Sequence, residues 1–143
     1  MDDQAAPALE ILTRLFEAQQ DIAIRYSRII TQYQDLEADV RAIFGRIIEE
    51  STAAALELKK FLARLSPGSD VSAGTIQPDI IALNGGKKEI LATCLTDLET
   101  LQTAYSIALS WKGTERIAGK FPFDHLQRLK LLHDHIRLTV EAQ

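Results

Sequence analysis

The chain has 143 residues, 46% of them hydrophobic and 25% charged, a balance typical of one globular domain rather than of a disordered segment. The net charge of −4 and the acidic start argue against a nucleic-acid partner, because neutralising phosphates needs clustered lysine and arginine. Neither a membrane-spanning apolar run nor a signal peptide is recognisable, so we expect a cytoplasmic protein without a membrane partner.

The first two predicted helices cover residues 7–33 and 36–65, where apolar side chains recur at steps of three and four. Pro7 suits a first helical turn. The connection between these helices is so short that they should form an antiparallel hairpin. The second helix is expected to end at Ser66 and Pro67, because proline cannot continue the hydrogen-bond ladder.

Residues 66–86 form a connection that is long for a compact domain. A crossover that runs the length of a helix bundle explains this length and makes the third helix parallel to the second. Within it, residues 78–83 are predicted to form a short helical turn against the bundle, closed by Asn84, Gly85 and Gly86.

The third predicted helix covers residues 87–112 and stops at Gly113, and the fourth covers residues 122–141 and opens at Pro122. A loop around Gly119 is expected between them. The sequence therefore predicts a single all-α domain over residues 1–143. Its architecture should be a four-helix bundle of two antiparallel hairpins joined by a long crossover.

One polar residue interrupts the apolar stripe of each predicted helix: Gln19, Glu50, Gln102 and His133. Each lies about fifteen residues from the turn of its hairpin, so all four should lie at a similar depth. We expect a polar layer in mid-bundle, with Glu50 paired to His133 because a buried carboxylate needs a partner. The layer could fix the register of the helices or hold a ligand.

Three further residues carry weaker signals. Cys94 is the one cysteine and falls on an apolar helix face, so we expect a buried, inert thiol. His125 and His135 fall away from the centre of the fourth helix's stripe, and we expect both to be solvated or interfacial.

Two segments resemble the small uncharacterised bacterial members of the ferritin-like superfamily. One is Leu83-Asn84-Gly85-Gly86 leading into Glu89-Ile90-Leu91, and the other is His133-Asp134-His135-Ile136-Arg137. The resemblance covers most of the chain and implies the two hairpins and the long crossover described above.

The resemblance also implies a carboxylate-bridged di-iron or di-manganese centre, as in the active relatives. Its ligands are a Glu from helices 1 and 3 and a Glu-x-x-His motif from helices 2 and 4. The matching positions here are Gln19 on the first helix, Glu50 and Ala53 on the second, Gln102 on the third, and Lys130 and His133 on the fourth. Only Glu50 and His133 keep the ligand type, so a degenerate site is expected.

Neutral amides and a lysine cannot supply the anionic oxygens that two hard cations need. Asp21 and Glu99 lie near the right depth, but helical spacing places Asp21 off the inner stripe and Glu99 on its flank. No cofactor is expected, and one Fe, Mn or Zn ion held by Glu50 and His133 stays open as an alternative.

Four apolar residues point away from the predicted core: Ile107, Trp111, Leu131 and Leu138. Because exposed apolar patches usually mark contacts, we expect a homodimer.

Three functions stay open. The favoured one is a non-catalytic oligomeric or interaction module without catalytic residues. The alternatives are a metal-binding or metal-oxidising protein with an incomplete site, and a small-molecule binder that uses the polar layer, with Tyr26 and Tyr105 as its walls.

Overall fold

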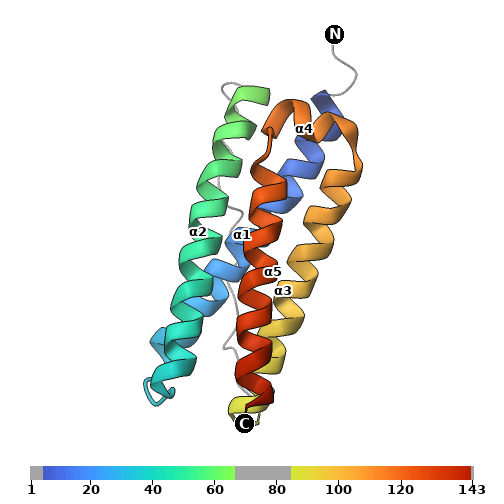
Figure 1. The fold of residues 1–143 in the computed structure, drawn as a ribbon. Coiled ribbons are helices and arrows are strands. Elements are labelled where there is room, and N and C mark those ends of the chain that lie inside the picture. Colours follow the sequence, from blue (N-terminus) through green and yellow to red (C-terminus); the bar gives the residue numbers. More distant parts are fainter. Residues whose placement is uncertain (1–4, 67–84, 143) are drawn as a thin grey trace.

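A computed structural model describes residues 5–66 and 85–142, which form five helices (Figure 1). They are α1 (Ala5–Gln32), α2 (Ala38–Leu65), α3 (Lys87–Ser110), α4 (Lys112–Ala118) and α5 (Phe121–Glu141). The described residues contain no strand, and the predicted all-α class is confirmed. The four long helices match the four predicted ones to within two residues at each end.

The first hairpin is held by a side chain that reaches across its turn. The guanidinium of Arg41 on α2 donates hydrogen bonds to the carbonyl oxygens of Tyr33, at 3.0 Å, and Ile30, at 3.5 Å. Carbonyl groups at the end of a helix lack partners within the helix and carry partial negative charge, so a cation is stabilising there. Arg41 thereby fixes the start of α2 beside the end of α1.

α1 packs on α2, α3 packs on α5, and α1 also contacts α3. Figure 1 shows that α1 and α5 run in one direction and α2 and α3 in the other. An ion pair between Asp39 and Lys87 joins the first turn of α2 to the first turn of α3, so these two helices start at the same end of the molecule. Most of the expected crossover, including the turn predicted at residues 78–83, lies outside the described residues.

The inner stripe predicted for α1 is buried: Leu12, Leu15, Gln19, Ile22, Tyr26 and Ile29. The predicted inner stripes of α3 and α5 are buried in part: Leu91, Leu98, Tyr105, Leu126, Leu129 and Ile136 lie in the core, but Gln102 and His133 lie at its edge. Leu101 is buried beside the half-buried Gln102, and Leu132 is buried beside the half-buried His133. Burying a leucine side chain gains roughly 2 kcal/mol, whereas burying an amide or an imidazole costs free energy unless it is hydrogen-bonded.

A loop was expected between the third and fourth predicted helices, but residues 112–118 form the short helix α4. Gly119 ends α4 with a positive φ of 59°, a conformation that favours glycine, and its N–H donates to the carbonyl of Glu115 at 2.8 Å. Gly113 lies under the indole of Trp111, since a Cβ atom there would come within 2.2 Å of a ring carbon. α4 covers one end of α1, α3 and α5 (Figure 1).

Cys94 is buried, as predicted, and burial raises the pKa of its thiol to about 12. Such a thiol stays protonated and is a poor nucleophile at neutral pH. No described helix combines the length and the apolar character needed to cross a membrane.

Candidate functional site

A buried polar cluster joins α1, α3 and α5. The side-chain amide nitrogen of Gln19 lies 2.8 Å from the hydroxyl of Tyr105 and 3.0 Å from Nε2 of His125. Gln19 and Tyr105 are fully buried, and His125 is 4% exposed. If the amide donates both hydrogen bonds, Nε2 of His125 is the acceptor and the ring carries its proton on Nδ1.

Aromatic rings surround His125. Its ring is stacked on Phe121 at a centroid distance of 5.7 Å and is tilted against Tyr105 at 5.2 Å. Burial, with a smaller contribution from the nearby Arg128, lowers the pKa of His125 to about 4. The imidazole is therefore neutral at physiological pH. Burial raises the pKa of Tyr105 above its ordinary value, so its phenol also stays neutral.

Two buried polar atoms have no hydrogen-bond partner within the described residues. They are Oε1 of Gln19 and Oγ1 of Thr114 on α4. A buried amide that satisfies only one of its two ends costs free energy. Exchanging the O and N atoms of the Gln19 amide would orphan its nitrogen instead. The cluster is therefore polar but incompletely satisfied.

The structure does not bring the four polar-layer candidates together. Only Gln19 lies in the core. Glu50, whose side chain is 28% exposed, lies 3.9 Å from Arg128, and His133, whose side chain is 19% exposed, lies 3.8 Å from Glu99. Gln102 lines a shallow surface depression on α3. Glu50 and His133 therefore do not pair with each other as expected. Arg128 lies beside Glu50, and Glu99 lies beside His133.

The residues considered as substitute ligands are also in other contacts. Asp21 accepts a hydrogen bond from Arg25 at 2.9 Å, and Glu99 is the neighbour of His133. Within residues 5–66 and 85–142, no three His, Cys, Asp or Glu side chains are grouped so that they could hold a metal ion. The metal-ligand candidates Glu50 and His133 therefore belong to no such group of three.

A second polar cluster lies between α1 and α3. The hydroxyl of Tyr26 donates a hydrogen bond to Asp97 at 2.6 Å, and Arg25 lies 3.4 Å from the same carboxylate. Burial, the neighbouring Cys94 and the charge of Asp97 raise the pKa of the Tyr26 phenol. Tyr26 and Tyr105 thus bind different partners and do not wall one common cavity around the predicted layer.

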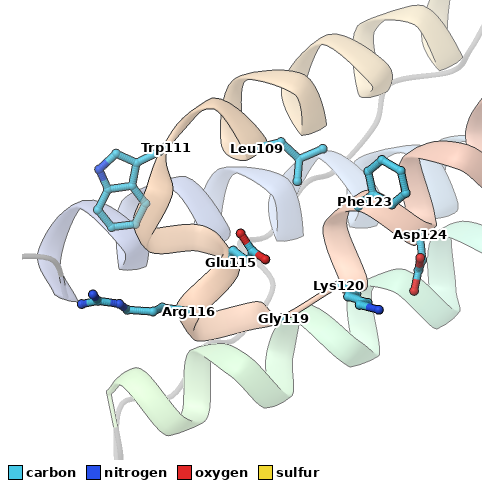
Figure 2. A pocket seen from close by; sticks show the side chains of 8 residues that line it. All are labelled: Leu109, Trp111, Glu115, Arg116, Gly119, Lys120, Phe123 and Asp124. Carbon is cyan, nitrogen blue, oxygen red and sulfur yellow. The ribbon is translucent and has the colours of Figure 1, made fainter.

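Residues of α5 line two of the pockets in the described part of the chain. The larger, of about 950 Å³, lies where α3, α4 and α5 meet, and Figure 2 shows Leu109 and Phe123 on facing sides of it. Its charged residues balance: Glu115 and Asp124 are acidic, whereas Arg116 and Lys120 are basic. This pocket therefore has no net preference for a cation or an anion.

The smaller pocket, of about 350 Å³, lies between α2 and α5. His125 lines it, so the buried cluster reaches the surface at this point, and Glu50 and Arg128 lie at its rim. The sequence argument placed His125 in a solvated or interfacial position, and this is wrong, because its side chain is buried in the core.

A signal for His125 was present in the sequence. The residues Pro122, His125, Leu129, Leu132 and Ile136 recur at steps of three and four and form the buried face of α5. This pattern competes with the overlapping stripe through His133. The stripe through His125 buries Leu132 and is therefore more favourable than the stripe through His133.

The fold and the pockets define an all-helical protein with an incompletely satisfied polar cluster in its core. No family model, no curated protein and no solved structure matches the chain.

Proposed function

We propose that this protein is a non-catalytic ferritin-like four-helix bundle that associates with itself and acts as an interaction module. The observation that carries the proposal is a line of exposed, uncharged side chains on the outward face of α3. The proposed second copy of the chain packs against this face.

The helix directions support the bundle. α1 with α2 and α3 with α5 form two antiparallel pairs, and the ion pair between Asp39 and Lys87 joins the starts of α2 and α3 (Figure 1). A chain that leaves the far end of α2 and enters α3 at this end needs a long connection, as in ferritin-like topology.

On the outward face of α3 the exposed Glu89 precedes, and the exposed Glu99 lies beside, a line of uncharged side chains. The members of this line are exposed residues at helical spacing on the side opposite the core. They are Thr93, Thr96, Thr100, Thr103, Ile107 and Ser110. The four threonine hydroxyls donate to carbonyl oxygens one turn back in the same helix, at 3.0–3.2 Å. The threonines therefore present mainly methyl groups to the outside, beside Ile107, which is 62% exposed.

Such a face suits a second copy of the same chain. A two-fold axis places identical patches against each other, so like charges at the centre of a patch would repel each other, and the line from Thr93 to Ser110 carries none. β-branched threonines are also less favourable than alanine, glutamate or lysine on an exposed helix face. A role in packing gives a reason for four of them on one line.

Charge insertion tests this proposal. Thr100→Lys places a charge in the middle of the face and should convert a dimer to a monomer in sedimentation velocity. Thr52→Lys, at an exposed threonine of α2, is the matched control and should leave the dimer intact. A dimer that tolerates Thr100→Lys but dissociates on Leu131→Lys would overturn the α3 interface, because Leu131 is 67% exposed on α5.

The metal-binding alternative has less support, because Glu50 and His133 have separate charged neighbours and belong to no group of three potential ligands among the described residues. Elemental analysis after anaerobic loading with Fe(II), Mn(II) or Zn(II) checks it. We expect less than stoichiometric metal. Stoichiometric metal that is lost in Glu50→Ala and His133→Ala would favour the alternative.

A further inference from the structure

The pocket between α2 and α5 is built from two matching sets of residues. Each helix contributes four positions spaced i, i+3, i+4 and i+7, which form one helical face. They are Glu50, Ala53, Ala54 and Glu57 on α2, and Phe121, Asp124, His125 and Arg128 on α5. The middle of the α2 face consists of the exposed Ala53 and the buried Ala54, whose short side chains leave space between the helices.

The rim of this pocket is acidic. Three carboxylates and one guanidinium give it a formal charge of −2. The charges are unevenly distributed, because Arg128 lies 3.9 Å from Glu50 at one end. At the other end Glu57 forms an ion pair with Lys60 on the same helix, and both side chains are exposed to solvent. Asp124 makes no ion pair within the described residues. Figure 2 shows the Asp124 carboxylate on α5, projecting from the first turns of the helix.

The floor is apolar and uncharged. It consists of the buried Ala54, the half-buried ring of Phe121 and the buried ring of His125, with the exposed Ala53 beside them. Nε2 of His125 lies 3.0 Å from the amide nitrogen of Gln19, so this ring atom already has a partner within the core. A neutral imidazole does not repel a cation, and an aromatic ring such as that of Phe121 attracts one.

We propose that the pocket between α2 and α5 binds a small organic cation, an alkylamine with a short apolar chain. The ammonium group binds at the end formed by Glu57, Asp124 and the ring of Phe121. The alkyl chain lies over Ala53 and Ala54 toward Arg128. This binding site is independent of the proposed self-association through α3.

The size of the pocket favours a small ligand over a drug-sized one, because 350 Å³ is near the lower end of the range of about 300–1,000 Å³ for ligand pockets. Charge selects the ligand class. An anion would meet three carboxylates at the rim, and a neutral alcohol would leave Asp124 without a counter-charge.

Titration of the full chain with three ligands of equal chain length tests the site. Pentylamine, pentan-1-ol and pentanoate are added separately, and chemical shifts of backbone amides are followed by NMR. Pentylamine should give saturable shifts centred on Ala53, Ala54, Phe121 and His125. The alcohol and the carboxylate should bind at least threefold more weakly. Equal affinity for pentylamine and pentan-1-ol would overturn the proposed charge selection.

Two pairs of variants localise the binding. Ala53→Leu fills the pocket and should abolish the shifts, whereas Ala42→Leu, at another exposed alanine of α2, should preserve them. Asp124→Asn should weaken the affinity for pentylamine about two- to fivefold, as expected for a solvent-exposed ion pair, and Asp134→Asn should not. Circular dichroism confirms that each variant is folded. Saturable shifts that persist in Ala53→Leu would place the amine elsewhere and contradict the proposal.

Discussion

The amide nitrogen of Gln19 lies 3.0 Å from Nε2 of His125, although 106 positions separate the two residues in the chain. The same nitrogen lies 2.8 Å from the hydroxyl of Tyr105. One buried amide on α1 thus contacts both helices of the α3 and α5 pair. The two helix pairs are therefore held together by a polar contact as well as by apolar packing.

Replacing the amide by an apolar side chain should destabilise the protein. Gln19→Met keeps most of the volume but removes the hydrogen-bond partner of Tyr105 and of His125. Leaving buried polar groups unpaired costs about 1–3 kcal/mol each, partly offset because the orphaned Oε1 also disappears. We expect a net loss of about 1–3 kcal/mol in urea unfolding. The exposed Gln127→Met is the control, and an equal effect of both changes would contradict the account.

The stability should depend on pH through His125. In the folded protein its pKa is about 4, below its ordinary value of 6.5. Between these values the unfolded chain binds a proton that the folded chain does not. The stabilising contribution is therefore fully present above pH 6.5, decreases as the pH falls toward 4, and does not decrease further below that. The total is up to about 3 kcal/mol.

Unfolding by urea at a series of pH values measures this contribution. His125→Gln keeps an acceptor for Gln19 and should remove the pH dependence between 4 and 6.5 that belongs to this residue. His135→Gln, at an exposed position on the same helix, should leave the dependence unchanged. A pH profile that is the same for wild type and His125→Gln would refute the role of the buried imidazole.

A pair of alanine substitutions tests which face of α3 is inside. Leu101→Ala removes a side chain that is 1% exposed and should cost about 2–5 kcal/mol. Gln102→Ala, one position along, should cost less than about 1 kcal/mol, because Gln102 is only half-buried. A larger loss of stability for Gln102→Ala than for Leu101→Ala in thermal unfolding would show that Gln102, not Leu101, lies on the buried face of α3.

Gly113→Ala should disturb the end of the molecule at α4. A Cβ atom at this position would overlap the indole of Trp111, so the ring must move. Trp111 is the one tryptophan of the chain, and a changed emission maximum would therefore report this position directly. Gly45→Ala is the control. Nothing lies within 4 Å of its new Cβ atom, and the change should stabilise α2 by about 0.5–1 kcal/mol.

The sequence was sufficient to predict the four long helices and the inner stripe of α1. Apolar spacing, Pro122 and the turn residues determine these features locally. The stripes of α3 and α5 were harder to predict because each helix carries two overlapping stripes. One passes through Leu101 and Leu132, and the other passes through Gln102 and His133. Periodicity alone does not separate them, whereas packing four helices together selects the stripe that buries leucine.

The predicted polar layer failed for the same reason. Gln102 and His133 lie at the edge of the core, and the residues that contact Gln19 are Tyr105, from the predicted stripe of α3, and His125, which was expected outside the core. On α2, Ser51 is buried in place of Glu50, because a small hydroxyl side chain is less costly to bury than a carboxylate. Equal depth along a bundle therefore predicts contact only when the rotation of each helix is known.

The mass of the wild-type chain in solution is the most direct test of the central claim, self-association through the threonine-rich outward face of α3. Multi-angle light scattering at micromolar concentration should give twice the monomer mass, and the Thr100→Lys variant should give the monomer mass under the same conditions. A wild-type chain that is monomeric throughout the micromolar range would contradict the claim.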